Sequence, residues 1–275
     1  MSNVKNLFCV RPTFLLNLGK IFYMVEICAI ASGSNGNCYY VGNEKEAILV
    51  DAGISCKHFL LRMDERNLDA SKIKAIFISH EHVDHIRGAR VISKKLNVPV
   101  FFTYGTWNNA HKSSKPTHYR FVHIDQPLEI GGFVIHAFAK NHDAIEPCSF
   151  RIEVDGVNVG VMTDIGSACN NVVHHLKLCN AVFLETNYDE TMLWEGTYPW
   201  PLKKRVASEQ GHLSNLQALN LILENAGDQL KTIFLSHLSG ENNTPEIAYE
   251  TFKPLHDKFE IIKTSRYGAS VVKIF

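Results

Sequence analysis

Residues 75–85 read AIFISHEHVDH, a short apolar run followed at once by three histidines, a glutamate and an aspartate. A continuous apolar run of this length is typical of a buried strand. Side chains two positions apart on an extended chain point the same way, so His80 and His82 can bind one ion. Asp84 and His85 lie where the chain turns into a helix and can face a second ion. Imidazole nitrogens with a few carboxylates are the ligands expected for Zn²⁺, with Mn²⁺ and Fe²⁺ as alternatives.

The composition is that of a globular protein of one large domain or two small ones. The chain has 275 residues, of which 45% are hydrophobic and 20% charged, so disordered, collagen-like and coiled-coil classes are excluded. Lys+Arg 28 balances Asp+Glu 28, so any contact with a polyanion must come from a local patch. The 7 cysteines are odd in number and include no C-x-x-C pair, which indicates free thiols and a cytoplasmic location.

The first part of the chain is expected to lie outside the domain. No acidic residue precedes Glu26, and no apolar run approaches the roughly 20 residues that span a bilayer. We therefore expect residues 1–23 to be a loose extension, with Met24 as an alternative start, and a single domain over 24–275. We expect no membrane contact, and protein partners are unknown.

From Val25 onward, β-rich runs alternate with helical patterns in two halves of similar layout. This arrangement predicts two sheets packed face to face with helices outside. Residues 84–96 are expected to form one helix, and Asn187–Glu190 matches a helix capping box. A second capping box at Ser214–Gln217 begins a helix whose apolar face is expected to be formed by Leu216, Leu219 and Leu223.

The run H-x-H-x-D-H at 80–85 resembles the signature of the metallo-β-lactamase-fold hydrolases, and the rest of that family's pattern follows in the same order. The resemblance implies a four-layer αββα sandwich of the α/β (α+β) class, with two facing mixed β-sheets. It also implies two divalent metal ions, Zn or Mn. The implied ligands are His80, His82 and His142 for one ion and Asp84, His85 and His237 for the other, with Asp164 shared by both. Asp51 is implied to support these ligand side chains without binding a metal itself.

The charge of such a site indicates its chemistry. Two divalent ions carry four positive charges, and the carboxylates of Asp84 and Asp164 neutralise two of them. The remaining positive charge favours a bridging hydroxide and an anionic substrate. Metal ions about 3.5–4 Å apart can also hold both oxygens of an in-line displacement. Relatives that reduce oxygen or nitric oxide have Glu where this chain has His82, and need a flavin domain. Hydrolysis is therefore favoured over redox chemistry.

Three further runs narrow the resemblance to the YycJ/WalJ-like branch, described as 5′→3′ DNA exonucleases. They are SGSNGN at 32–37, ETNYD at 185–189 and GHLSN at 211–215. The resemblance implies a phosphodiesterase acting on DNA, in which Asp84, His212 and Glu185 take part in catalysis and the last two form a dyad beside the scissile phosphate. We expect the substrate to contact Ser32, Ser34, Asn37, Ser214 and Asn215.

Other functions remain open at this point. They are a small-molecule hydrolase acting on a cyclic phosphodiester, thioester or lactone, an RNA-processing nuclease, and a metal-stabilised module without catalysis. Basic stretches at Arg87–Lys95, Lys112–Arg120 and Lys203–Arg205 are each either a solvated face or a phosphate contact. The residues alone do not fix the metal, DNA against RNA, or the end that is attacked.

Overall fold

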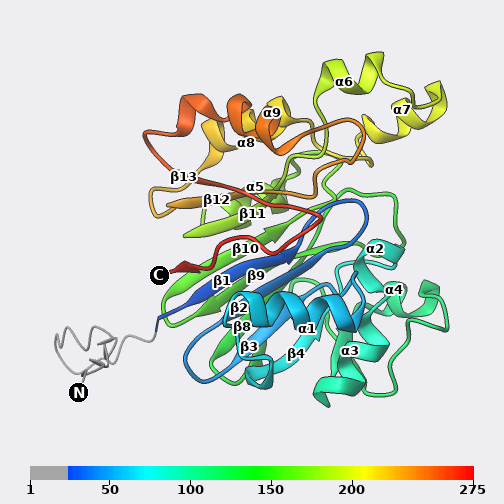
Figure 1. Cartoon of the computed structure of the whole chain (residues 1–275), viewed down its shortest axis with the longest axis vertical. Coiled ribbons are helices and arrows are strands. Elements are labelled where there is room, and N and C mark those ends of the chain that lie inside the picture. The colour runs from blue at the N-terminus through cyan, green and yellow to red at the C-terminus, as the bar shows by residue number, and fades with distance from the viewer. Residues whose placement is uncertain (1–23) are drawn as a thin grey trace, which may run out of the picture.

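The computed structural model describes residues 24–275, and these form four layers (Figure 1). Two seven-stranded sheets pack face to face, and helices cover the outer face of each. The expected αββα sandwich is confirmed, whereas the expectation for residues 1–23 lies outside the described residues. Within 24–275, no helix is both long enough and apolar enough to cross a membrane.

The first sheet is covered by the helices of the N-terminal half. Its strands, in spatial order, are β14 (Lys273–Ile274), β1 (Glu26–Ala31), β2 (Cys38–Gly42), β3 (Ala47–Val50), β4 (Ile73–Phe77), β5 (Val100–Phe102) and β6 (Tyr119–Phe121). The helices are α1 (Cys56–Glu65), α2 (Val83–Ile86), α3 (Ala89–Leu96) and α4 (Tyr104–Asn109). These four helices lie at the bottom and right of Figure 1.

The second sheet is built from the C-terminal half. Its strands, in spatial order, are β13 (Glu260–Lys263), β12 (Thr232–Ser236), β11 (Ala181–Glu185), β10 (Val157–Met162), β9 (Cys148–Val154), β8 (Phe133–Ala139) and β7 (Leu128–Ile130). Its helices are α5 (Asn170–Leu176), α6 (Glu190–Glu195), α7 (Trp200–Val206), α8 (Asn215–Asn225) and α9 (Pro245–Thr251). Figure 1 shows α6 and α7 extending from the body at the top right.

The two sheets repeat one pattern of pairing. From β14 to β6 and again from β7 to β13, three antiparallel pairs are followed by three parallel pairs. Asp51 after β3 and Asp164 after β10 therefore occupy matching places, and both have positive φ, 61° and 55°. His237, directly after β12, has φ 55°. Backbone strain of this kind tends to gather at functional sites, and here it marks the ends of these strands.

Three apolar clusters hold the layers together. Between the sheets, the Tyr39 and Phe183 rings lie 4.9 Å apart and the Phe77 and Phe150 rings 5.6 Å apart. A second cluster joins the first sheet to its helices, and a third joins the second sheet to α5, α8 and α9. The core therefore leaves only the strand ends and their loops free to form a site.

The single helix expected over 84–96 is wrong, because the chain breaks between α2 and α3. Gly88 N donates to the carbonyl of Ala52 at 2.8 Å, and a Cβ at Gly88 would lie 2.0 Å from the carbonyl oxygen of Ile54. Only glycine permits this close approach. The break separates the short helix α2, with Asp84 and His85, from α3.

The apolar face expected for the helix after Ser214 is confirmed for Leu219 and wrong for Leu216 and Leu223, which are exposed. The buried face is completed by Ala218 and Ile222, and the expected capping box is present.

The capping box expected at Asn187 does not form. The N-cap of α6 is Asp189, whose side chain accepts from Met192 N. The Asn187 side chain instead donates to the carbonyl oxygen of His237 at 2.8 Å. A long-range contact has therefore taken the side chain that the local pattern assigned to a helix start.

Candidate metal centre

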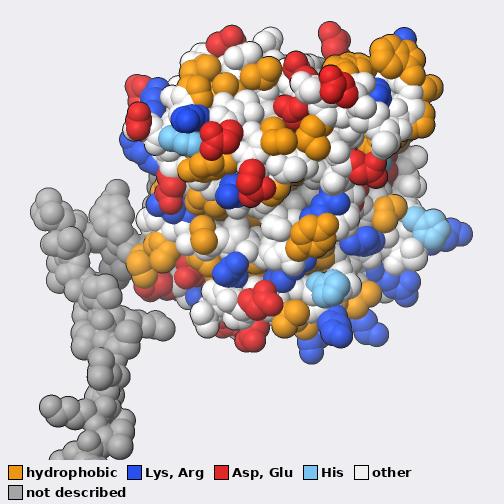
Figure 2. All heavy atoms as spheres, turned by 45° about the horizontal axis from the view of Figure 1, so that its top comes forward, with side chains coloured by type: hydrophobic (Ala, Val, Ile, Leu, Met, Phe, Trp, Pro, Cys, Tyr) orange, Lys and Arg blue, Asp and Glu red, His pale blue; other side chains and the backbone are white. Residues whose placement is uncertain are grey.

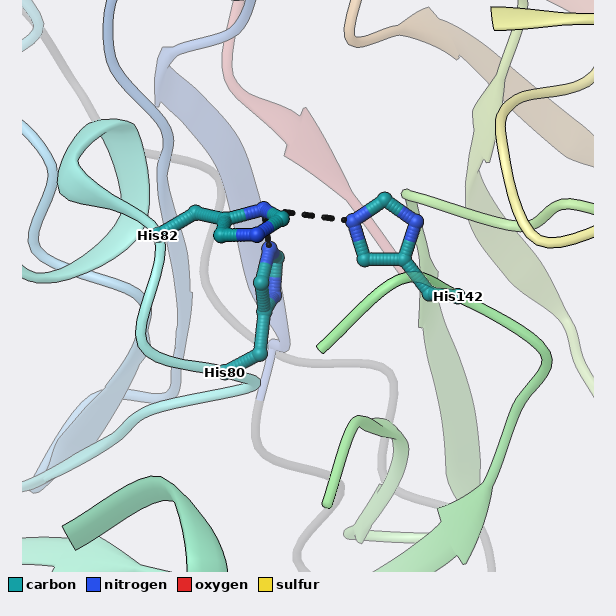
Figure 3. Close-up of side chains that lie close together, drawn as sticks. All are labelled: His80, His82 and His142. Carbon is teal, nitrogen blue, oxygen red and sulfur yellow. Dashed lines mark hydrogen bonds between the residues drawn. The ribbon is translucent and has the colours of Figure 1, made fainter. Parts of the chain in front are cut away.

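Three histidines converge at one end of the sandwich (Figure 3). His80 Nε2 lies 3.1 Å and His142 Nε2 3.3 Å from His82 Nδ1. A tetrahedral Zn²⁺ with bonds of about 2.0–2.1 Å separates its nitrogen ligands by about 3.3 Å, so these rings are spaced to share one ion. Burial holds the pKa of His80 well below its ordinary value and lowers that of His142 to about 4. Both rings are therefore neutral, as metal ligands must be.

A second group of ligand atoms lies beside the first. Asp84 Oδ2 is 3.2 Å from His85 Nε2 and 3.3 Å from His237 Nε2. Burial works against charge on these rings, but Asp164 and Asp84 raise the pKa of His85 well above its ordinary value. The same carboxylates, together with Glu185, raise the pKa of His237 to about 10. In the ion-free protein, protons on His85 and His237 therefore supply the positive charge that lies beside these carboxylates.

Asp164 lies between the two groups. Its carboxylate oxygens are 3.2 Å from His85 Nε2, 3.5 Å from His237 Nε2 and 3.7 Å from His142 Nε2. Oδ2 is buried and makes no hydrogen bond of good geometry among the described residues, although His85 Nε2 lies 3.2 Å from it as an ion-pair partner. A buried carboxylate needs positive charge beside it. Burial works against ionisation of Asp164, but in the absence of an ion His237 and His85 supply that charge and hold the pKa of Asp164 well below its ordinary value. The imidazole and carboxylate donors gathered around Asp164 therefore fit divalent metal ions.

In His80 and His85, the ring nitrogen that faces away from the candidate metal site is hydrogen-bonded to another side chain. Asp51 is buried; its Oδ2 lies 2.7 Å from His85 Nδ1, and its Oδ1 accepts from Ser79 N at 2.8 Å. Ser79 Oγ lies 2.9 Å from His80 Nδ1 and donates to Asp51 Oδ2. Such partners orient ligand rings and tune their basicity. Sequence reasoning placed Asp51 here but missed Ser79, whose only signal is its position just before His80.

Glu185, the last residue of β11, connects three loops of the site. Its Oε1 accepts from His212 Nδ1 at 2.8 Å and His237 Nδ1 at 2.9 Å. Its Oε2 accepts from Ile165 N at 2.7 Å and Leu213 N at 3.1 Å. Burial alone would raise the pKa of Glu185, but the two histidines hold it at about 2, so the group is ionised. The contact with His237, missed by sequence reasoning, follows from the register that pairs Glu185 with Ser236.

His212 is the partly open member of the dyad that the sequence predicted. Its side chain is 21% exposed, and Nδ1 faces Glu185. Within residues 24–275, Nε2 bonds to no protein group, so it is the atom left to meet a ligand.

The five residues expected to contact substrate differ in their surroundings. Ser34 alone is exposed. Ser32 Oγ accepts from His237 N at 2.7 Å, and Asn37 Nδ2 donates to Asp84 Oδ2 at 3.1 Å. Ser214 caps α8, and Asn215 bonds Asn243. The buried four thus hold loops and ligands in place, and their side chains are not open to a substrate.

In the basic stretch Lys203–Arg205, Lys203 is buried and the other two side chains are exposed. Lys203 Nζ donates to the carbonyl of Trp194, while Arg205 pairs with Asp143 beside His142. Lys204 Nζ lies 5.3 Å from the Trp200 ring. The stretch therefore supports α7 and the His142 loop more than it offers free charge.

Comparison with known proteins agrees with this geometry. A family model described as "Beta-lactamase superfamily domain" matches residues 46–237. The chain belongs to this superfamily. Two curated relatives are similar: exodeoxyribonuclease YycJ of Bacillus anthracis, 34% identical over 82% of this chain and 86% of its own, and exodeoxyribonuclease WalJ of Streptococcus pneumoniae, 33% identical over 81% and 84%.

A solved structure confirms the fold. The metallo-β-lactamase fold protein YhfI of Bacillus subtilis superposes with a TM-score of 0.71 at 19% identity, covering 92% of this chain and all of its own. The family match, the two exodeoxyribonuclease relatives and this fold together identify the protein as an enzyme, a hydrolase of the metallo-β-lactamase fold, with His and Asp clusters suited to divalent metal.

Metal binding to this protein is expected to release protons, and the affinity for the metal ion is expected to increase as pH rises. At neutral pH the raised pKa values of His85 and His237 leave protons on both rings of the ion-free protein, and an ion must displace them. Calorimetric titration of the chelator-treated protein with Zn²⁺ in two buffers of different ionisation enthalpy measures the release. Equal heats in both buffers would contradict this protonation state.

Proposed function

We propose that this protein is a binuclear metal-dependent phosphodiesterase, acting on DNA as an exonuclease from 5′ ends. The observation that carries the proposal is the buried carboxylate of Asp164 between two groups of candidate ligands, with the His212–Glu185 dyad alongside. The names of the YycJ and WalJ relatives, matched over four fifths of this chain, support a nuclease and a DNA substrate.

Each ligand group would hold one ion. His80, His82 and His142 would hold the first, Asp84, His85 and His237 the second, and Asp164 would contact both. When bound, such ions supply positive charge for the phosphodiester and acidify water. The ligand side chains that hold them are already oriented by Asp51, Ser79 and Glu185.

His212 would act on the substrate itself. Because Nδ1 is held by the ionised Glu185, Nε2 faces the open side and can donate a hydrogen bond or a proton to a phosphate oxygen. The same Glu185 fixes His237, so the acid–base group and a metal ligand are positioned by one carboxylate. A cytoplasmic location is supported by six described cysteines, all free and four of them buried.

We expect metal-dependent release of mononucleotides from a DNA end. The test uses 5′- and 3′-end-labelled single- and double-stranded DNA and RNA, each with Zn²⁺, with Mn²⁺ and with chelator. Early release of the 5′ label as a mononucleotide, with gradual shortening of the 3′-labelled strand, supports the proposal. Cleavage of RNA alone, or of only a small cyclic phosphodiester, thioester or lactone, would replace DNA as the substrate class.

A further inference from the structure

Four aromatic rings form a continuous surface strip on α4 and the edge strand β6. The Tyr104 and Phe121 rings are 5.7 Å apart, Phe121 and Tyr119 5.8 Å, and Tyr119 stacks on Trp107 at 3.8 Å. Tyr104, Tyr119 and Phe121 are 66%, 41% and 38% exposed. Tyr119 and Phe121 are two residues apart on a strand, so they share the face on which α4 lies. We call these four residues, Tyr104, Trp107, Tyr119 and Phe121, the α4–β6 strip.

The strip lies in a segment that contains basic residues and no acidic ones. Residues 97–124 contain no Asp or Glu, although they include Lys112, Lys115 and Arg120 and three histidines. Lys115 Nζ lies 4.9 Å from the centre of the Trp107 ring. Figure 2 shows Lys and Arg side chains gathered at the lower right, the side on which Figure 1 places α2, α3 and α4. The protein as a whole has no net charge, so this is a local feature.

A series of hydrogen bonds connects the strip to the loops of the candidate metal centre. Gly105 N donates to Glu146 Oε2 at 2.6 Å, and Thr103 Oγ1 donates to the Glu146 carbonyl at 3.1 Å. The adjacent Ile145 N donates to Glu81 Oε1 at 3.0 Å. Glu81 lies between two ligand histidines, and Ile145 and Glu146 belong to the loop that carries His142. The first turn of α4 is therefore held against the ligand loops, with Tyr104 at its exposed end.

We propose that the α4–β6 strip binds single-stranded nucleic acid, the bases stacking on its rings while lysines neutralise the phosphates. This inference rests on the proposed nuclease function and names the form of the substrate. Every base has a π face, so a row of exposed rings beside cations binds single strands with little sequence preference. In a duplex the bases are stacked inside the helix, so no base face is free to stack on these rings.

The charge also argues against a second copy of the chain as the occupant. A two-fold contact brings the same patch of each copy together. Lys112 and Lys115 would then face their own equivalents, with no Asp or Glu from residues 97–124 to pair them. Like charges across an interface cost free energy, whereas a phosphate backbone supplies the opposite charge.

The test is the double variant Tyr104→Ala/Phe121→Ala, whose rings are exposed and whose loss leaves the core intact. Binding of a fluorescent oligothymidylate of about 15 nucleotides is measured by anisotropy in chelator, so that no strand is cut. Stacking contributes about 1–3 kcal/mol per base, so we expect affinity for the single strand to fall at least about tenfold. Affinity for a duplex of the same length should change by less than about twofold.

Two matched controls separate the strip from general effects. Leu178→Ala/Leu223→Ala removes exposed apolar side chains on the other half of the molecule, one just after α5 and one on α8, and should leave affinity unchanged. Lys115→Ala should weaken binding, whereas Lys258→Ala, which removes a lysine 5.1 Å from the Phe259 ring, should not. Hydrolysis of bis(p-nitrophenyl) phosphate, which has no nucleotide chain to lie along the strip, should keep its kcat/KM in every variant.

The outcomes distinguish the strip from the function on which it rests. Unchanged single-strand affinity in the double variant, with DNA cleavage intact in the unaltered protein, overturns the strip alone. No cleavage of any nucleic acid by the unaltered protein overturns the proposed function. A dimer by light scattering that the double variant converts to monomer overturns the strip in favour of a second copy.

Discussion

Replacement of Asp164 by Asn is expected to reduce phosphodiester hydrolysis by at least about a thousandfold and to lower the bound metal. The buried carboxylate lies against His85, His237 and His142, between the two groups of candidate ligands. An amide removes the negative charge and turns an N–H₂ toward the ions. Metal charge stabilisation is worth several kcal/mol, and each 1.36 kcal/mol is tenfold in rate. Turnover and metal content by mass spectrometry check the prediction.

Asp155→Asn provides the control for this variant. Asp155 also lies at a strand end with positive φ, 49° against 55° for Asp164, and its Oδ2 accepts from Asn43 at 2.7 Å. Asn tolerates this backbone conformation, so neither variant should fail through strain. Asp155→Asn should keep full turnover and metal. If Asp164→Asn did the same, the binuclear centre proposed here would be wrong.

The structure brings together the side chains that the sequence singled out as candidate metal ligands, and most of them follow a buried strand. His80 to His85 are contiguous after β4, and Asp164 and His237 come within two residues of the ends of β10 and β12. Strand ends are fixed by local apolar patterns, and parallel neighbours bring their ends to one edge. The strand pattern explains why these residues meet at one edge, whereas the choice of Asp164 and His237 as candidate ligands came from the family resemblance.

The parts that could not be predicted depend on partners distant in the chain. At the break, Gly88 N donates to the carbonyl of Ala52, a partner distant in the chain that no local pattern reveals. α4 was not predicted, because Tyr104–Asn109 contains Gly, Thr and Asn, which are poor helix formers. It forms with Thr103 as its cap and with Glu146 bonded to its first turn.

The loop residues show the same limitation for function. Ser32 and Asn37 are polar, and in sequence they indicate a surface that binds substrate. In the structure they are buried and bond His237 N and Asp84. A hydroxyl or amide that holds a ligand loop cannot be told from one that meets substrate until the fold places it.

Replacement of His212 by Ala is expected to lower turnover by about 10²–10⁴-fold, the range for loss of a general acid or base, with metal content unchanged. The ring is partly exposed, and Nε2 has no partner within residues 24–275, so its loss leaves both ligand groups intact. Hydrolysis of labelled DNA and mass-spectrometric metal content measure the two effects. Loss of metal along with activity would make His212 a ligand or a structural residue.

Glu185→Gln separates the two tasks of the dyad. Four donors point at this carboxylate, from His212, His237, Ile165 and Leu213, and an amide must turn its N–H₂ toward one pair of them. A buried donor left without an acceptor costs about 1–3 kcal/mol. Unlike His212→Ala, this variant should therefore lower thermal stability and weaken metal binding through His237, as well as slow turnover. If it matched His212→Ala in every respect, Glu185 would serve His212 alone, and its contact with His237 would have no part in holding the metal.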